Sequence, residues 1–142
     1  MILAVDHGDS RIGLAVSHGV VAEGLKAIDC SGKSNARIFE EIAELAHQQK
    51  AKTIVVGLPL GRWGLETKQS RKVIEWADQL REATGLSIEL VEEAYSTVEA
   101  RRVAGGIPRS AKSRRSEKGF FDCEAAKIIL EQYLNEKRHS SL

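Results

Sequence analysis

The stretch ILAVDHGDSRIGLAVS, residues 2–17, decides the fold that this sequence predicts. Two short apolar runs, Ile2–Val5 and Ile12–Ser17, flank a cluster of Gly, Asp and Ser. Apolar runs separated by such turn-forming residues are typical of two antiparallel strands. A third run, Val20–Ile28, follows after another glycine. The start of the chain therefore predicts a three-stranded antiparallel meander.

Beyond residue 32 the apolar residues recur at helical spacing. An amphipathic helix is expected to begin near Ser34, with its apolar stripe at Ile38, Ile42, Leu45 and Ala46. The β-branched run Thr53–Gly57 predicts a strand that is covered on both faces and lies inside a sheet. The segment Gly57–Gly64 contains four Gly or Pro residues, so we expect an irregular loop.

The second half of the chain continues the alternation of helix and strand. A helix with Val73, Ile74, Ala77 and Leu80 facing inward should end at Thr84-Gly85, and Ser87–Val91 reads as the next strand. We then expect a short helix from about Thr97 to Ala104, a mobile basic loop to Lys118, and a last helix from about Glu117 to Lys137. This order predicts an α/β fold: a mixed sheet of three antiparallel strands followed by parallel strands, with helices on both faces.

Length and composition indicate one domain. A chain of 142 residues with 42% hydrophobic residues can bury a sizeable core, so we expect a single domain over residues 1–137 and a frayed tail over residues 138–142. The two cysteines, Cys30 and Cys123, lack CxxC spacing and read as free thiols. No secretory signal and no apolar run of membrane-spanning length is evident, which predicts a cytoplasmic protein with no membrane partner.

The charge is distributed unevenly along the chain. The formal net charge is +1, but the segment 101–118 carries seven Lys or Arg against one Glu, a net +6 that leaves −5 on the rest. Such a cluster attracts phosphates whatever the total charge, although a solvated basic loop is the commoner reading of such a run. The residues of this segment that we expect to contact nucleic acid are Arg109, Lys112, Arg114, Arg115 and Lys118.

Three carboxylates stand where an ordinary surface acid is not expected. Asp6 and Glu93 each follow an apolar strand, and Asp122 is on the apolar side of the last helix, in line with Ala125 and Ile129. Each alone also reads as a turn-forming, solvated or helix-terminal acid. Together they predict a site for Mg²⁺ or Mn²⁺, at which metals would activate water while the basic segment holds a phosphodiester. This combination describes a metal-dependent nuclease.

Four segments in order, VDHGDSRIGLAVS, IVVGLPLGRWG, LVEEAYSTVEA and KGFFDCEAAKIILEQYL, resemble the YqgF family. These ribonuclease H-like proteins are described as Holliday junction resolvases and as the nuclease that matures the 5′ end of pre-16S ribosomal RNA. The resemblance covers Ile2 to Leu134 and implies a ribonuclease H-like fold, a two-metal site and phosphodiester hydrolysis. It assigns the catalytic, metal-holding acids to Asp6, Glu93 and Asp122.

The sequence departs from the family pattern at two places. Gly61 stands where Asn is usual, and Ala94 stands where Arg usually follows the central glutamate. Loss of that arginine is expected to weaken substrate binding or orientation of the glutamate unless Arg62 or Arg11 substitutes for it, and Arg11 reads equally well as a structural partner of Asp9 or Glu93. Trp63 reads as an aromatic ring packed over its loop rather than stacked on an unpaired base.

Several functional alternatives follow from these residues. The favoured function is an endonuclease for pre-16S ribosomal RNA. A resolvase of branched DNA and a non-catalytic nucleic-acid binding module are the alternatives, and either a monomer or a homodimer is compatible with the sequence. An actin-like ATPase is disfavoured because one lobe of 142 residues cannot enclose ATP as two lobes do, and because Gly32-Lys33-Ser34 follows Ala27 at the position where a Walker-type phosphate loop requires a glycine.

Overall fold

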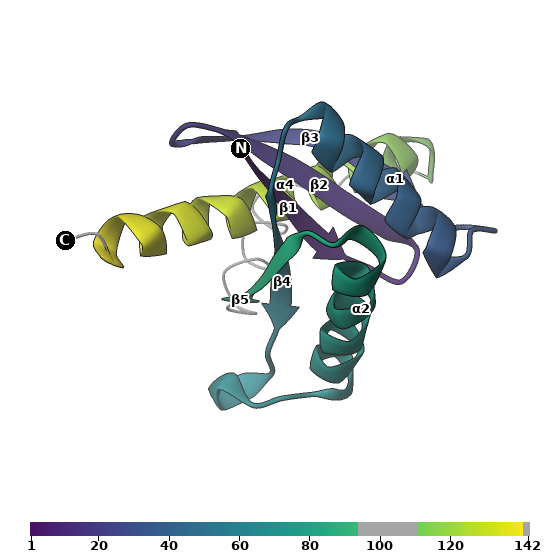
Figure 1. Ribbon diagram of the computed structural model, residues 1–142. Coiled ribbons are helices and arrows are strands. Elements are labelled where there is room, and N and C mark those ends of the chain that lie inside the picture. The colour runs from purple at the N-terminus through teal and green to yellow at the C-terminus, as the bar shows by residue number, and fades with distance from the viewer. Residues whose placement is uncertain (94–110, 141–142) are drawn as a thin grey trace.

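The computed structural model describes residues 1–93 and 111–140, with side chains at 1–61, 63–93 and 123–138. One five-stranded sheet has the strand order β3-β2-β1-β4-β5, and helices lie on both of its faces (Figure 1). The strands are β1 (Ile2–His7), β2 (Arg11–His18), β3 (Val21–Asp29), β4 (Thr53–Pro59) and β5 (Ser87–Glu93). The helices are α1 (Asn35–Gln48), the short 3-10 turn η1 (Arg62–Gly64), α2 (Lys68–Thr84) and α4 (Ala111–Ser140).

The sheet is mixed, as the sequence predicts. β1, β2 and β3 pair antiparallel as a meander, whereas β4 pairs parallel with β1 on one side and with β5 on the other. β1 is therefore the central strand, and β4 is an interior strand. Since β1, β4 and β5 run in the same direction, their carboxyl ends meet at one edge of the sheet, where ligands bind in open α/β sheets.

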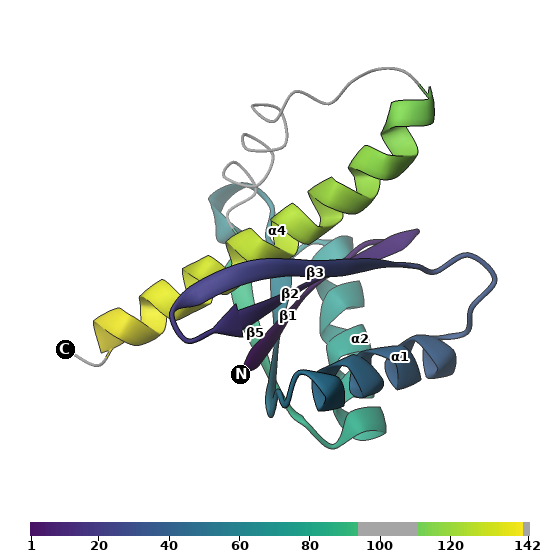
Figure 2. The ribbon, with the colours of Figure 1, turned by 90° about the horizontal axis from the view of Figure 1, so that it is seen from above.

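The two faces of the sheet bury side chains of different size. The face under α1 and α2 is built from large residues, including Leu3, Val5 and Leu14. The face under α4 carries smaller ones, such as Ala4 and Ala15. This difference lets α4 cross close over the sheet on the side opposite α1 and α2, which Figure 2 shows from above.

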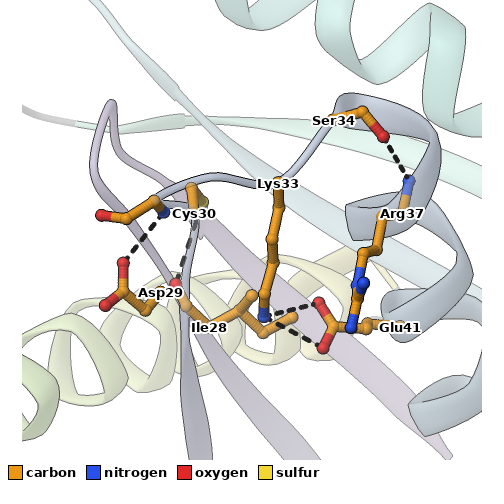
Figure 3. Close-up of polar contacts among 8 residues, drawn as sticks. Ile28, Asp29, Cys30, Lys33, Ser34, Arg37 and Glu41 are labelled. Atoms are coloured by element: carbon orange, nitrogen blue, oxygen red, sulfur yellow. Dashed lines mark hydrogen bonds and ion pairs between the residues drawn. The ribbon is translucent and has the colours of Figure 1, made fainter.

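Local sequence sets the ends of the two shorter helices. Ser34 caps α1 by accepting a hydrogen bond from the Arg37 backbone N–H, and the preceding turn is held where the Lys33 ammonium binds the Glu41 carboxylate (Figure 3). α2 begins with a capping box between Thr67 and Ser70. It ends at Gly85, whose φ of 70° is the left-handed cap that glycine adopts without strain.

Two predictions about irregular segments are wrong. β4 continues to Pro59 instead of ending at Gly57, because parallel pairing with β5 runs on to the Pro59–Glu93 pair. The basic residues 111–118, predicted as a loop, form the first turns of α4. Ala, Lys, Arg and Glu are good helix formers, and residues 111–118 contain neither Gly nor Pro, so the packed part of the helix propagates toward its N-terminus.

The remaining predictions concern chain ends, thiols and membranes. The predicted helix over residues 97–104 lies outside the described residues, and α4 extends to Ser140 rather than ending at Lys137. Cys30 and Cys123 are both reduced thiols, as expected. None of the helices in the described part of the chain is long and apolar enough to cross a membrane.

Candidate functional site

Asp6 lies at the carboxyl edge of the central strand, on the face that α4 covers. Strand residues alternate between faces, and Asp6 shares its face with buried Ala4. Across the antiparallel pair it stands opposite Gly13, which has no side chain to cover it. The carboxylate is therefore partly exposed, while the strand that carries it is fixed by pairing on both sides.

Glu93 ends β5 on the same face and is 8% exposed. Its strand neighbour toward the centre is β4, where Gly57 leaves room for the carboxylate: a Cβ at Gly57 would lie 3.2 Å from Glu93 Oε2. Since Val5 pairs with Val56, the next residues along β1 and β4 bring Asp6 beside Gly57. The two acids thus flank a glycine of the strand that separates them.

The importance of Gly57 is a feature that sequence reasoning missed. A Cβ at this position would lie 2.4 Å from Cδ1 of Ile129, so the glycine also sets how closely α4 approaches the sheet. The available signal was a glycine that ends an otherwise β-branched run, TIVVG. Such a glycine commonly marks close approach of another group to the strand.

Asp122 lies on α4, the helix that covers Asp6 and Glu93, and its side chain is outside the described residues. Position 122 precedes Ala125, Ala126 and Ile129 at intervals of three, four and seven residues, which places all four positions on one side of the helix. Ala126 and Ile129 are buried against the sheet, and Ala125 is buried beside Ile128. The fold therefore brings the backbone of Asp122 to the face that carries the other two acids.

The donors at this edge fit a hard divalent cation. Asp6 and Glu93 offer carboxylate oxygens, the ligands that Mg²⁺ and Mn²⁺ prefer. Among the side chains that the structure describes, no three His, Cys, Asp or Glu residues form a metal-binding cluster. The third predicted ligand, Asp122, is not among those side chains.

The predicted substrate-binding residues fall into three groups. Arg11 begins β2 at the same edge of the sheet, opposite Asp29 of β3. Lys112, Arg114, Arg115 and Lys118 belong to α4, on the turns that precede Asp122. Arg62 belongs to η1, which follows β4, and Arg109 lies outside the described residues.

Within α4, two of the basic positions align with the predicted acid. Positions 115 and 118 precede 122 by seven and four residues, so they share one side of the helix with it. A helix rather than a loop fixes this spacing. The basic residues, which the sequence predicts to form a mobile loop, therefore lie on the helix that contains Asp122.

His7, although adjacent to Asp6, belongs to the opposite face. Its ring lies 4.6 Å from that of Trp76 on α2, and burial lowers the pKa of His7. It lines a pocket of about 230 Å³ with Lys72 and Asp9, which form an ion pair at 2.5 Å. Strand alternation thus places His7 on the face opposite Asp6, outside the predicted metal site.

Trp63 does not pack over its loop, contrary to expectation. The side chain is 91% exposed, and its backbone φ of 66° is in the left-handed region. The loop is instead closed by backbone hydrogen bonds, from Gly61 N–H to the Leu65 carbonyl at 2.9 Å and from Gly64 N–H to the Gly61 carbonyl at 3.2 Å. These bonds make the turn without using the indole ring.

Known proteins resemble this chain over nearly its whole length. Proteins to which pre-16S rRNA nuclease activity is ascribed by name include one from Thermoanaerobacter pseudethanolicus, 36% identical over 97% of this chain and 98% of its own. Another, from Clostridioides difficile, is 36% identical over 98% of this chain and 96% of its own. The expected resemblance to the YqgF family is confirmed by these relatives.

The fold also matches a solved structure. RuvC from Thermus thermophilus superposes with a TM-score of 0.54 over 97% of this chain and 96% of its own, at 14% identity. This confirms the predicted ribonuclease H-like fold. The family model described as RuvX, Holliday junction resolvase, matches residues 1–136. The chain therefore belongs to the RuvX family.

Proposed function

We propose that this chain is a metal-dependent endonuclease that hydrolyses phosphodiester bonds of structured RNA, and that its substrate is the 5′ region of precursor 16S ribosomal RNA. The observation that carries the proposal is the position of Asp6 and Glu93. They flank Gly57 at one sheet edge, under the helix that carries Asp122. The names of the relatives from Thermoanaerobacter and Clostridioides support the choice of RNA substrate.

In this proposal Asp6, Glu93 and Asp122 hold Mg²⁺ or Mn²⁺. When bound, the metal supplies Lewis acidity that activates water and stabilises the leaving oxygen. Asp6 offers its carboxylate from a strand paired on both sides, so little reorganisation is needed when substrate arrives. Glu93 is restrained because its side chain is nearly buried beside Gly57. Its carboxylate would either ligate the metal or orient the attacking water.

The basic side of α4 has the complementary task of holding the substrate. Arg115 and Lys118 precede Asp122 on one helix side, and Lys112 and Arg114 add charge to the same turns. Contacts from Lys and Arg to phosphates position a nucleic acid without reading its sequence. A nucleic-acid strand bound along this part of α4 would have a phosphodiester next to the acids. We therefore assign the substrate path to the first turns of α4.

A test separates the proposed RNA nuclease from its alternatives. Wild-type protein is incubated with a precursor 16S rRNA fragment that spans the 5′ boundary, and separately with a four-way DNA junction, each with Mg²⁺ or Mn²⁺. We expect cleavage of the RNA that is lost in Asp6→Asn. The matched control is Asp9→Asn, because Asp9 is an exposed acid of the adjacent turn that pairs with Lys72.

The possible results have distinct meanings. Cleavage of the RNA by wild type and Asp9→Asn but not by Asp6→Asn supports the proposal. Equal cleavage by all three proteins contradicts the assignment of Asp6.

A junction resolvase is the second candidate, favoured by the description of the RuvX family. Symmetric cleavage of a four-way junction requires two active sites related by a twofold axis, and hence a homodimer. Cleavage of the junction alone, by a protein that sediments as a dimer, would favour this function. Salt-sensitive binding of either substrate without cleavage would instead favour a non-catalytic binding module.

A further inference from the structure

The loop between β4 and α2 leaves the sheet at the edge where the proposed acids lie. Pro59, the last residue of β4 before the loop, pairs in register with Glu93. The loop is anchored at both ends, since the Ser70 hydroxyl donates a hydrogen bond to the Pro59 carbonyl and the Thr67–Ser70 capping box fixes the start of α2. Together with the two backbone bonds that close Gly61–Leu65, these contacts give the loop one defined shape.

At the tip of this loop a tryptophan is presented to solvent. Trp63 is 91% exposed, whereas Trp76, the other tryptophan of the chain, is 5% exposed in the core. Large aromatic residues are mostly buried, so an indole left in water calls for an explanation. Trp63 also has a φ of 66°, a conformation that disfavours bulky side chains and that glycine would adopt freely.

Strain and exposure at one residue indicate selection for something other than folding. Neither the packing of the loop nor its hydrogen bonds involve the Trp63 ring among the described contacts. Sparsely populated backbone conformations persist where the surrounding structure enforces them, and they gather at binding sites. The loop therefore holds the Trp63 ring in a fixed position that is exposed to solvent.

The surroundings of Trp63 favour a nucleobase as the group that covers it. Arg62 precedes Trp63 in the sequence, and proteins that bind single-stranded nucleic acid combine aromatic side chains with positive charge. The exposed apolar surface near it is small, with Leu65 as its 63% exposed neighbour. Of the other large apolar residues exposed in the described part of the chain, Val20 and Val21 lie at the β2–β3 turn on the opposite sheet edge, Met1 precedes β1, and Leu90 lies within β5. A protein partner would need a broader apolar patch.

We infer that Trp63 is a stacking platform for an unpaired base of the substrate, placed just beyond the cleavage site. This inference rests on the proposed function, because it takes the acids at the sheet edge as the point to which substrate is brought. It adds a specificity: the chain should prefer nucleic acid with an unpaired base next to the phosphodiester it holds. A fully paired helix offers no free base face to the ring.

The test measures binding rather than cleavage. All proteins carry Asp6→Asn, so that substrate stays intact, and are titrated in Mg²⁺ against an RNA hairpin with a single-stranded extension. The same hairpin with its extension paired to a complement serves as the competing ligand. Fluorescence anisotropy of a labelled RNA gives the dissociation constants.

Three variants at the loop sharpen the comparison. Trp63→Ala should weaken binding of the single-stranded extension by about 5-fold or more, the scale of one base stacked on an aromatic ring, and leave binding of the paired form unchanged. Trp63→Phe should bind both RNAs with dissociation constants close to those of the Asp6→Asn protein that keeps Trp63, because phenylalanine also offers an aromatic ring. Leu65→Ala removes the neighbouring exposed apolar side chain and should have no effect.

Intrinsic fluorescence gives an independent readout. The chain has two tryptophans, so the difference in emission between Trp63 and Trp63→Phe proteins reports the loop alone. We expect this signal to be quenched when the single-stranded extension binds, and unaffected by the paired form.

Two results would overturn the inference. The first is that Trp63→Ala binds both RNAs as tightly as the Asp6→Asn protein that keeps Trp63. A protein partner would then be the remaining candidate to cover the Trp63 ring. The second is equal weakening for single-stranded and paired RNA. A failure of the nuclease proposal would instead appear as an absence of cleavage by the wild-type protein, which this binding experiment does not use.

Discussion

The carboxylate of Glu93 lies over the backbone of Gly57, at a distance of 3.2 Å from the position that a Cβ on Gly57 would occupy. The same absent side chain lets Ile129 of α4 reach the sheet, since its Cδ1 would lie 2.4 Å from that Cβ. One glycine on β4 thus controls both the position of an acid and the seating of the helix that carries another. Its consequences can be separated by mutation.

We predict that Gly57→Ala destabilises the protein by about 1–3 kcal/mol, the cost of overpacking a well-filled core. It should also reduce cleavage by displacing the Glu93 carboxylate. Adding Ile129→Val removes Cδ1, the nearest clashing atom, but keeps the methyl equivalent of Cγ1, which would lie 3.0 Å from the new Cβ; it should recover part of the stability but not the activity. Denaturant unfolding and a cleavage assay on the same preparations check both effects.

The control for this substitution is Gly24→Ala, on β3, where another residue of the sheet approaches α4. A Cβ there would lie 3.3 Å from the Cβ of Cys123, a milder approach than that at Gly57. We expect a smaller loss of stability and unchanged cleavage. If Gly57→Ala cut as fast as wild type, the closeness of Gly57 and Glu93 would have no bearing on catalysis.

Glu93→Gln should lower the rate of cleavage by roughly 100-fold or more, as expected when a group that stabilises the transition state is removed. The adjacent Glu92→Gln makes the same chemical change on an exposed side chain and should leave the rate near wild type. Single-turnover rates with saturating Mg²⁺ provide the measurement. Comparable rates for the two variants would show that the buried position of Glu93 does not matter.

The basic turns of α4 should govern the salt dependence of binding. Replacing Arg115 and Lys118 with Gln is predicted to lower the slope of log K against log[salt] by about one for each phosphate that is no longer neutralised. Arg138→Gln, an exposed charge at the far end of the same helix, is the control and should not change the slope. A slope that stays the same in the double variant would place the phosphate path elsewhere.

Tyr133 predicts a loss of stability at high pH. Its hydroxyl donates a hydrogen bond to Glu89, and burial together with this bond raises the pKa of Tyr133 to about 12. A folded-state pKa above that of the unfolded chain means that the stabilisation is complete below about pH 10 and is lost as pH rises to about 12. Two pKa units correspond to about 3 kcal/mol, which screening by nearby solvent reduces.

The variant Tyr133→Phe tests this assignment. It should cost about 1 kcal/mol at neutral pH, the net value of one hydrogen bond, because the Glu89 carboxylate loses its donor. Stability measured by urea unfolding should then fall less between pH 10 and pH 12 than in wild type. An identical alkaline decline in both proteins would assign it to other groups, such as lysines.

Much of the fold can be read from local patterns. The turn cluster after Asp6 and the apolar runs on either side predict the meander that the structure contains. Ser34 and Gly85 mark a helix start and a helix end correctly, because capping depends on residues that are adjacent in sequence.

The errors arise where a distant partner decides the conformation. β4 extends into a segment rich in Gly and Pro because β5 pairs with it as far as Pro59, and no local signal reports that pairing. The basic residues of α4 are helical because the helix continues from its packed part, which the charge pattern alone does not reveal.

For the candidate site, the sequence by itself determined which residue types are available: Asp6 and Glu93 after apolar strands, Asp122 on an apolar helix side, and a basic segment before it. Only the tertiary structure decided that Asp6 and Glu93 flank one glycine, that His7 packs against Trp76, and that Trp63 is exposed in the loop that leaves this edge. The reason is physical. Side-chain chemistry and strand alternation are local, whereas the neighbours of a residue are set by parallel strand pairing and by which face of the sheet a helix covers.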